Sequence, residues 1–336
     1  MDTHSCGAAE RPPRFFATFA GYDLGHSHLH RGSALVVLGA DWLVDGASAV
    51  ARRSGLSEFV IGATIVAIGT SMPEFVVSGI AAIEGSAGMA VGNVCGSNLF
   101  NTLLILGVTA LILPLNYTRG NIRRDIPLCI GISALFLLFA YLPAGNPGIN
   151  RWEGIVLLLG FAAYLWYNFK SGKESGEEEE SPKAPMPVWK MIVLILIGLG
   201  GLIGGGQLFV DSAVSIAHRL SVPESVIGIT IVAFGTSLPE LAVCVAAAVK
   251  GRAQMAIGNI IGSNISNILL IVGFSATVSP LLIDPVNALG ILLAALSAVL
   301  LMLSMFPLRT HRLDRWEGAL FVALYLSYIV WLILNR

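Results

Sequence analysis

The chain contains nearly the same fifteen-residue segment twice, and this duplication constrains its fold more than any other feature. VIGATIVAIGTSMPE spans Val60 to Glu74, and VIGITIVAFGTSLPE spans Val226 to Glu240, 166 residues later. Twelve of the fifteen aligned positions are identical, and the other three exchange one apolar residue for another. The chain is therefore predicted to contain two copies of one folding unit.

A second pair of segments shares the same spacing. Residues 89–107 read MAVGNVCGSNLFNTLLILG, and residues 255–273 read MAIGNIIGSNISNILLIVG. Near the end of each half, the tetrapeptide RWEG occurs at residues 151–154 and again at residues 315–318. We infer that one unit of about 150 residues was duplicated, an arrangement typical of membrane transporters.

The composition places the chain in a membrane. Of the 336 residues, 55% are hydrophobic and 12% are charged, with a mean hydropathy of +0.78. This leaves too few polar residues to cover a soluble globule, so we predict an all-α polytopic protein in contact with the lipid bilayer. The net charge of −1 and the absence of a basic cluster argue against nucleic acid as a partner. The four cysteines are isolated, which argues against disulfides or a thiolate metal site.

Ten apolar segments are long enough to span the membrane, five in each copy of the repeat. They cover approximately residues 32–51, 57–83, 87–113, 124–143, 153–169, 188–217, 222–249, 253–281, 285–306 and 316–334. We therefore predict ten transmembrane helices.

The chain is predicted to divide into four parts. Residues 1–31 form a polar N-terminal tail, residues 32–169 the first repeat, residues 170–187 an acidic linker, and residues 188–336 the second repeat. The second repeat opens with a long apolar run, whereas the matching part of the first repeat is polar up to Ser33. The first helix is therefore expected to be truncated.

The distribution of positive charge predicts an orientation. Alternate connections place fourteen Lys and Arg residues on one side of the membrane and six on the other. Because cytoplasmic loops are enriched in these residues, the linker is predicted to be cytoplasmic and both termini to lie outside. Five spans is an odd number, so the two repeats enter the membrane in opposite directions. They are expected to be inverted repeats whose broken helices meet near the bilayer midplane.

Each copy of the first motif places one acidic residue within an apolar segment. Glu74 and Glu240 have no other acid in the preceding fifteen residues. A charged side chain at the bilayer centre costs roughly 2.5–3.5 kcal/mol on insertion scales, so each glutamate requires a partner. A lone acid bonded to a neighbouring helix is the simpler interpretation, but the occurrence at two matched positions favours a functional site.

The residues before each glutamate are suited to cation binding. Pro73 and Pro239 lack an N–H group, so they leave backbone carbonyls of the preceding turn without helical partners. Such carbonyls are cation ligands, and helical spacing places hydroxyl and carboxylate oxygens on the same side. The hydroxyl groups belong to Thr70 and Ser71 in the first copy and to Thr236 and Ser237 in the second.

The second motif adds a polar stripe to each of two further helices. Asn93, Ser97 and Asn101 are spaced four residues apart, as are Asn259, Ser263 and Asn267. The alternative interpretation is a seam of small residues with asparagines that hold two helices together. Carboxylate, amide, hydroxyl and carbonyl oxygens suit hard cations such as Ca²⁺ or Na⁺, and they suit zinc or copper poorly.

The paired GTSxPE and GNxxGSNxxN segments resemble the α-repeats of the Ca²⁺/cation antiporter superfamily, most closely its prokaryotic Na⁺/Ca²⁺ exchanger branch. The resemblance covers residues 35–336. It implies a prokaryotic plasma (inner) membrane location and a monomeric exchanger with no cofactor. It also implies a central Ca²⁺ site formed by Glu74, Glu240 and the carbonyls of Thr70 and Thr236.

The same resemblance implies two flanking Na⁺ sites, one built by Ser71, Ala67 and Ser263 and the other by Ser237, Ala233 and Ser97. Asn101 and Asn267 are expected at the middle of the cluster. Because an Asp at the position of Asn267 is typical of K⁺-coupled relatives, the Asn argues mildly against K⁺ dependence.

The favoured hypothesis is an antiporter that exchanges Na⁺ for Ca²⁺ by alternating access. Exchange of H⁺ for Ca²⁺ is the alternative within the same class, because two buried carboxylates can carry protons. An intramembrane metalloenzyme is disfavoured because the spans contain no HExxH motif. A channel is disfavoured because paired broken helices occlude a site more readily than they line an open pore.

Overall fold

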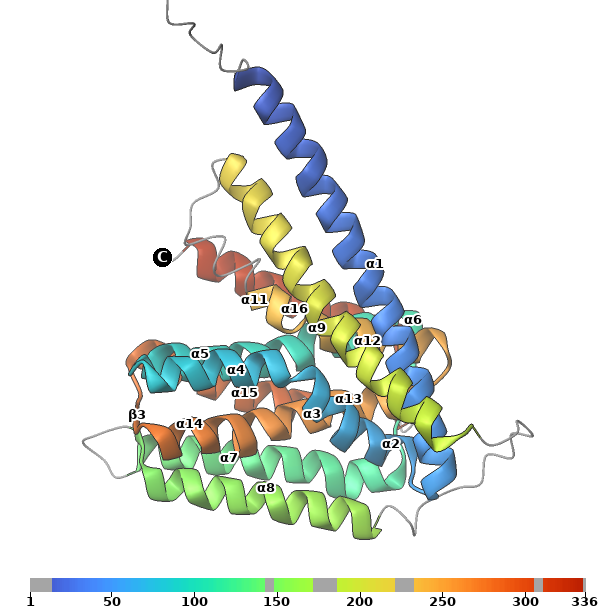
Figure 1. The fold of residues 1–336 in the computed structure, drawn as a ribbon. Helices are drawn as coiled ribbons and strands as arrows, with labels where there is room; N and C mark the ends of the chain where they lie inside the picture. Colours follow the sequence, from blue (N-terminus) through green and yellow to red (C-terminus); the bar gives the residue numbers. More distant parts are fainter. Residues whose placement is uncertain (1–13, 143–147, 172–185, 221–232, 305–310, 335–336) are drawn as a thin grey trace, which may run out of the picture.

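The computed structural model describes residues 14–142, 148–171, 186–220, 233–304 and 311–334, and most of them are helical (Figure 1). The first half contains α1 (Arg14–Ser54), α2 (Glu58–Ile61), α3 (Ala67–Thr70), α4 (Met72–Ile83), α5 (Ala87–Leu99), α6 (Leu106–Ile112), α7 (Ile126–Tyr141) and α8 (Arg151–Ser171). The second half contains α9 (Val188–Arg219), α11 (Ala233–Thr236), α12 (Leu238–Val249), α13 (Ala253–Ser266), α14 (Gly273–Val278), α15 (Pro285–Leu303) and α16 (Arg315–Leu334).

Wider π-helical turns connect α2 to α3, α5 to α6 and α13 to α14, and another begins the span of α7. They are η1 (Gly62–Val66), η2 (Phe100–Ile105), η3 (Asn121–Asp125) and η5 (Asn267–Val272). The η2 and η5 turns begin at or next to a predicted site asparagine. Because a π-turn rotates the residues that follow it relative to an α-helix, these positions deviate from simple helical spacing, as is frequent at functional sites.

The helices are those of an integral membrane protein. Within the described ranges, six helices are long and apolar enough to cross a membrane, and a seventh span results if α2 to α4 count as one. The apolar helices Leu238–Val249 and Asn287–Leu303 are shorter. The predicted total of ten spans stays a prediction, because residues 221–232 of one expected span lie outside the described residues.

The proline-containing motifs break their helices, as the sequence predicts. The segment from Glu58 to Ile83 bends by 49° at Ser71, where α3 ends and α4 begins. Ser237 has nearly the same backbone conformation as Ser71 and separates α11 from α12. In both copies the proline occupies the first turn of the new helix, where its missing N–H costs no helical hydrogen bond.

The first helix differs from the sequence prediction. We expected a polar tail over residues 1–31 and a truncated helix after it, but α1 begins at Arg14 and contains 41 residues against 32 in α9. The prediction relied on apolar content, and polar residues do not by themselves end a helix. Residues 14–31 contain no proline, and the Pro12-Pro13 pair comes directly before the helix, where proline is best tolerated.

Helices α1 and α9 form a long pair that runs across the remaining helices (Figure 1). Glycines allow their backbones to approach closely: a Cβ atom added to Gly39 would lie 2.7 Å from the carbonyl oxygen of Gly198. Lys250, at the end of α12, attaches to this pair through its Nζ, which lies 2.6 Å from an Asp41 carboxylate oxygen and 2.7 Å from one of Asp45.

Four two-residue strands in the described part of the chain correct the prediction of a purely α-helical fold. Antiparallel pairing joins β1 (Leu115–Asn116) to β4 (Arg312–Leu313) and β2 (Gly148–Ile149) to β3 (Leu281–Leu282). Strands this short carry no alternating pattern, so the sequence did not reveal them. By the spacing of the repeat, β1 corresponds to β3 and β2 to β4. Each pair therefore joins one repeat to the other.

Among the candidate spans in the described residues, the one that begins with α13 and continues to Val278 is the most buried. Its backbone crosses η1 and α2 at very short range. A Cβ atom added to Gly258 would collide with the carbonyl oxygen of Phe59, and one added to Gly262 with that of Ala63. Only glycine allows this approach. The crossing brings the second motif of one repeat against the first motif of the other.

Candidate cation-binding site

Glu74 and Glu240 each lie in the first turn of the helix that follows a break, α4 and α12 respectively. Both are 1% exposed. The start of a helix has unsatisfied N–H groups and a partial positive charge, which favours a carboxylate there. The break therefore offsets part of the cost of burying each acid.

Each carboxylate accepts a hydrogen bond from the other repeat. The Ser71 hydroxyl donates to Glu240 Oε1 over 2.9 Å, and the Ser237 hydroxyl donates to Glu74 Oε1 over 2.9 Å. The Ser237 oxygen also lies 3.3 Å from the Ser97 hydroxyl oxygen. These reciprocal contacts place the two breaks face to face, with both carboxylates between them.

The second oxygen of each carboxylate has no hydrogen-bond partner, and the same is true of two amide oxygens. The four buried atoms are Glu74 Oε2, Glu240 Oε2, Asn101 Oδ1 and Asn267 Oδ1. An unsatisfied buried acceptor typically costs about 1–3 kcal/mol, and a charged one costs more. Four such oxygens, contributed equally by the two repeats, match the ligand chemistry of a dehydrated hard cation.

The other predicted site residues surround this cluster to different degrees. Ser263 is buried, and its hydroxyl has no hydrogen-bond partner. The buried Thr70 hydroxyl donates to Asn259 Oδ1 over 3.3 Å. The Ala67 carbonyl accepts from the Ser71 N–H over 3.0 Å, and its oxygen also lies 3.4 Å from the Thr70 hydroxyl oxygen. Ala233 and Thr236 are the first and last residues of α11.

Two asparagines that the sequence reasoning missed complete the polar centre. Asn98 and Asn264 follow Ser97 and Ser263 directly and are each 4% exposed. Their amides contact those of Asn267 and Asn101. The signal was present in the sequence, because GSN occurs at the same place in both motifs. The prediction considered only residues spaced four apart, so it omitted the asparagine of GSN.

Asn93 and Asn259, by contrast, hold neighbouring helices together. The Asn93 amide donates to the Ser78 hydroxyl over 2.9 Å and to the Glu74 backbone carbonyl over 3.3 Å. The matching Asn259 amide lies 3.3 Å from Cys244 Sγ. Asn93 and Asn259 therefore form the helix-to-helix contacts of the alternative interpretation, whereas Ser97 of the same stripe contacts Ser237 beside the carboxylates. The role of the stripes in cation binding stays a prediction.

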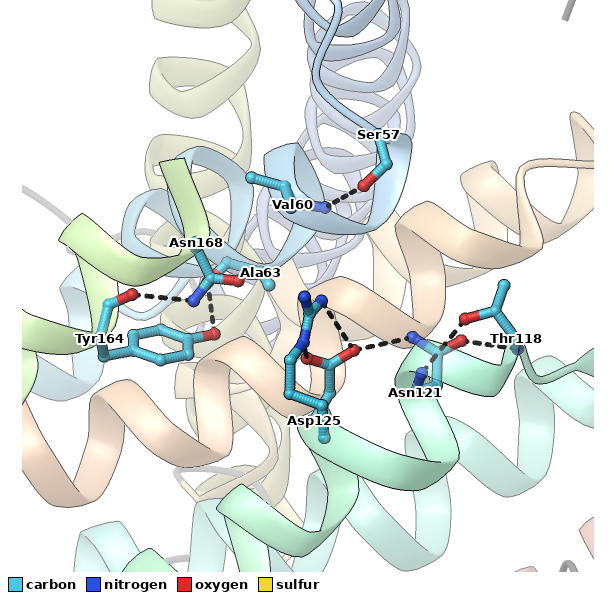
Figure 2. Close-up of polar contacts among 9 residues, drawn as sticks. Ser57, Val60, Ala63, Thr118, Asn121, Asp125, Tyr164 and Asn168 are labelled. Carbon is cyan, nitrogen blue, oxygen red and sulfur yellow. Dashed lines mark hydrogen bonds and ion pairs between the residues drawn. The ribbon is translucent and has the colours of Figure 1, made fainter. Parts of the chain in front are cut away.

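Two further groups of polar contacts lie near the segment that leads to the first break, and one of them, through Tyr164, bonds to it (Figure 2). Arg124 Nε lies 2.7 Å from Asp125 Oδ1, and the Asn121 amide donates to Asp125 Oδ2 over 3.2 Å. The Tyr164 hydroxyl donates to the Ala63 carbonyl in η1 over 3.2 Å. Asp125 thus has partners for both oxygens, unlike Glu74 and Glu240.

The ligand inventory excludes a clustered thiolate or histidine site from the part of the chain that the structure describes. That part contains no group of three or more His, Cys, Asp or Glu residues placed to hold a metal ion. The cluster instead combines two carboxylates with neutral oxygens. This combination suits Ca²⁺ or Na⁺, for which amide and carbonyl oxygens are normal ligands.

Comparison with known proteins identifies the family. The family model "Sodium/calcium exchanger protein" matches residues 31–170 and 190–334, which is most of the chain. The chain belongs to this sodium/calcium exchanger family. The resemblance stated from the duplicated motifs is therefore confirmed, including the prokaryotic branch, and the family is one of membrane transporters.

Several relatives of the chain are similar over nearly their full length. The putative antiporter CaxA of Alkalimonas amylolytica is 39% identical over 308 residues, with 88% of this chain and 95% of that protein covered. The sodium/calcium exchanger MaX1 of Methanosarcina acetivorans is 32% identical over 335 residues, with 89% and 95% covered. The solved structure of the sodium-calcium exchanger NCX_Mj soaked with 2.5 mM Na⁺ and 10 mM Sr²⁺ matches with a TM-score of 0.79 and 36% identity, over 91% of this chain and 98% of that one.

The unpartnered carboxylate oxygens lead to a prediction about stability in the absence of ions. Glu74→Gln removes one of two buried acids that lack a counter-charge, so the exchanger in chelator at neutral pH should melt at an equal or higher temperature than the unsubstituted protein. Asp125→Asn is the matched control. It removes the partner of Arg124 and should destabilise the fold by about 1–3 kcal/mol. Thermal melting of detergent-solubilised protein measures both. Equal destabilisation by the two substitutions would contradict this account of the site.

Proposed function

We propose that this exchanger is a secondary antiporter that moves Na⁺ and Ca²⁺ in opposite directions by alternating access, with Glu74 and Glu240 as the central Ca²⁺ ligands. The observation that carries the proposal is the set of four buried, unpartnered acceptor oxygens, two carboxylate and two amide. Neither repeat alone supplies the full set. The site is therefore complete only when both repeats face each other.

The charge of the site explains why the two ions compete. Two ionised carboxylates neutralise one Ca²⁺, and in a medium of low effective dielectric constant an unneutralised ion is strongly disfavoured. The same oxygens, with neighbouring hydroxyls and carbonyls, can instead hold several Na⁺. We assign one flanking Na⁺ site to Ser71, Ala67 and Ser263 and the other to Ser237, Ala233 and Ser97. The carbonyls of Thr70 and Thr236 complete the Ca²⁺ site.

The strand pairs support an inverted arrangement of two five-helix repeats. Strand β1 follows α6 in the first repeat, and its partner β4 precedes α16 in the second, so these two connections lie on the same face. Strands β2 and β3 join the complementary connections. Repeats that enter the membrane in the same direction would put the members of each pair on opposite faces. Opposite entry puts them together, as inverted transporter repeats do.

The names of the relatives favour sodium as the coupling ion. MaX1 is called a sodium/calcium exchanger, and the NCX_Mj structures describe a sodium-calcium exchanger. We extend that coupling to this chain and assign it the prokaryotic plasma (inner) membrane, with the central linker cytoplasmic, the termini outside and the monomer as the functional unit. Exchange of H⁺ for Ca²⁺ at the same carboxylates is the second candidate.

The first test is gradient-driven uptake of ⁴⁵Ca²⁺ into proteoliposomes. Vesicles loaded with Na⁺ and diluted into Na⁺-free medium should take up Ca²⁺, whereas a pH gradient without Na⁺ should drive no uptake. Glu74→Gln and Glu240→Gln should each abolish the flux, because one carboxylate leaves a bound Ca²⁺ half-neutralised. The exposed carboxylate of Glu84 provides the control, and Glu84→Gln should transport normally.

Two outcomes would contradict the proposal. Flux close to that of the unsubstituted protein in either glutamine variant of the site would rule out the two-carboxylate Ca²⁺ site. Uptake driven equally well by a pH gradient in Na⁺-free medium would assign the transporter to proton coupling.

The second test concerns sidedness. Arg151 and Arg315 occupy matching positions at the starts of α8 and α16, and both are exposed. In a Cys6→Ser background, an impermeant thiol reagent should label Arg151→Cys only from outside and Arg315→Cys only from the cytoplasm. The three remaining native cysteines are buried. Labelling of both positions from the same side would rule out the inverted arrangement.

A further inference from the structure

Asn98 on α5 and Asn264 on α13 lie beside each other, and the side-chain amide of Asn98 donates to the backbone carbonyl of Asn264 over 3.2 Å. Each is buried, and each contacts the candidate ligand asparagine of the opposite repeat, Asn267 or Asn101. An amide has one end that donates and one that accepts, so its orientation decides whether it offers oxygen or N–H groups to a neighbour. The hydrogen bonds around these four residues determine that orientation.

The orientation of Asn267 follows from a backbone carbonyl. Asn98 Nδ2 lies 3.2 Å from the Asn264 carbonyl oxygen, which can only accept, so this end of the Asn98 amide must be the donor. The other end is Oδ1, which accepts from Asn267 Nδ2 over 2.9 Å. The donor end of Asn267 is therefore committed to Asn98. Its Oδ1 is the end that remains buried and without a partner.

The matching half of the network reaches the same result by a different contact. Asn264 Oδ1 accepts from Asn101 Nδ2 over 3.1 Å, and Asn264 Nδ2 donates to the Thr102 hydroxyl over 2.8 Å. The Asn101 oxygen is left without a partner. A hydroxyl can both donate and accept, so the Thr102 contact fixes the orientation of the Asn264 amide less strictly than the Asn264 carbonyl fixes that of Asn98.

We propose that Asn98 and Asn264 are positioning residues that hold the amides of Asn267 and Asn101 with their oxygens toward the transported cation. This inference rests on the proposed function, because it presumes that the oxygens ligate a cation. It adds residues that act through the ligands without touching the ion. Without them, a freed amide could rotate and present N–H groups, which repel a cation.

The arrangement also determines the charge of the site. Asn98 Oδ1 requires a hydrogen-bond donor at position 267, and an ionised carboxylate there would place oxygen against oxygen. Asn98 therefore favours a neutral side chain at position 267, so that the site carries only the two charges of Glu74 and Glu240. Simple helix-to-helix adhesion is the competing explanation. It predicts a loss of stability without a specific effect on the ligand.

A double-mutant cycle distinguishes the two explanations. The variants are Asn98→Ala, Asn267→Ala and the double substitution, and the Ca²⁺ dissociation constant is taken from the Ca²⁺-dependent rise in melting temperature in a buffered Ca²⁺ series. Asn98→Ala should weaken Ca²⁺ binding by about tenfold, equivalent to about 1.4 kcal/mol. In the Asn267→Ala background it should have almost no further effect, because its target is already absent.

The control removes a buried amide elsewhere. Asn168 is 3% exposed and donates to the Tyr164 carbonyl over 2.9 Å. Asn168→Ala should lower the ion-free melting temperature and leave the Ca²⁺ dissociation constant unchanged. Should Asn98→Ala prevent folding, the cycle of Asn264→Ala with Asn101→Ala tests the same claim on the matching half.

Each remaining outcome decides the question. Unchanged Ca²⁺ affinity in Asn98→Ala, or additive effects in the double variant, would overturn the positioning role. An Asn267→Ala variant that binds Ca²⁺ normally would overturn it as well, because Asn98 acts through that side chain. Failure of the unsubstituted protein to respond to Ca²⁺ would instead overturn the proposed function.

Discussion

Two carboxylates buried without a counter-charge are the constraint on which the rest of the structure depends. An acid within a membrane span is tolerated only where hydrogen bonds, a charge partner or water compensate for lost hydration. Here only half of each carboxylate is compensated. One oxygen of each glutamate accepts a hydrogen bond from a serine hydroxyl of the opposite repeat, and the other oxygen has no hydrogen-bond partner. The broken helices, the glycine-mediated crossing of α13 and the hydrogen bonds among the four asparagines all surround these oxygens.

The symmetry of the two repeats is close at the ligands and looser around them. The serine-to-glutamate contacts have the same length in both directions, whereas the neighbouring positions differ. Cys244 takes the place of Ser78, and Ile268 takes the place of Thr102. Lys250, which pairs with Asp41 and Asp45 on α1, corresponds to the acidic Glu84. Both repeats thus contribute the same side chains to the carboxylate cluster, while the residues around the cluster differ between the two repeats.

Sequence reasoning was most successful where one residue type has one physical consequence. Proline without an N–H had to break each helix near Glu74 and Glu240, and both breaks are present. The membrane class followed from composition, and the family followed from the duplicated motifs. The proposed ion ligands stay predictions, although the unpartnered oxygens of Glu74, Glu240, Asn101 and Asn267 are consistent with them.

The failures have physical causes too. The length of α1 was underestimated because the prediction followed apolar content, and polar residues do not by themselves end a helix. The strand pairs depend on contacts between residues far apart in the chain, such as Leu115 with Leu313, which no local pattern encodes. Asn98 and Asn264 were missed because the prediction followed four-residue spacing, although GSN occurs at the same place in both motifs. Their hydrogen bonds became visible only in the structure.

The most direct test of the central claim is an anomalous difference map from crystals of this exchanger soaked in Sr²⁺, an electron-rich substitute for Ca²⁺. The account predicts one strong peak coordinated by Glu74 Oε2 and Glu240 Oε2, beside the amide oxygens of Asn101 and Asn267. Oxygen ligands should lie near the distances typical of Ca²⁺ sites, about 2.3–2.6 Å, or slightly farther. A map with no peak between the two glutamates, or with its main peak elsewhere, would contradict the account.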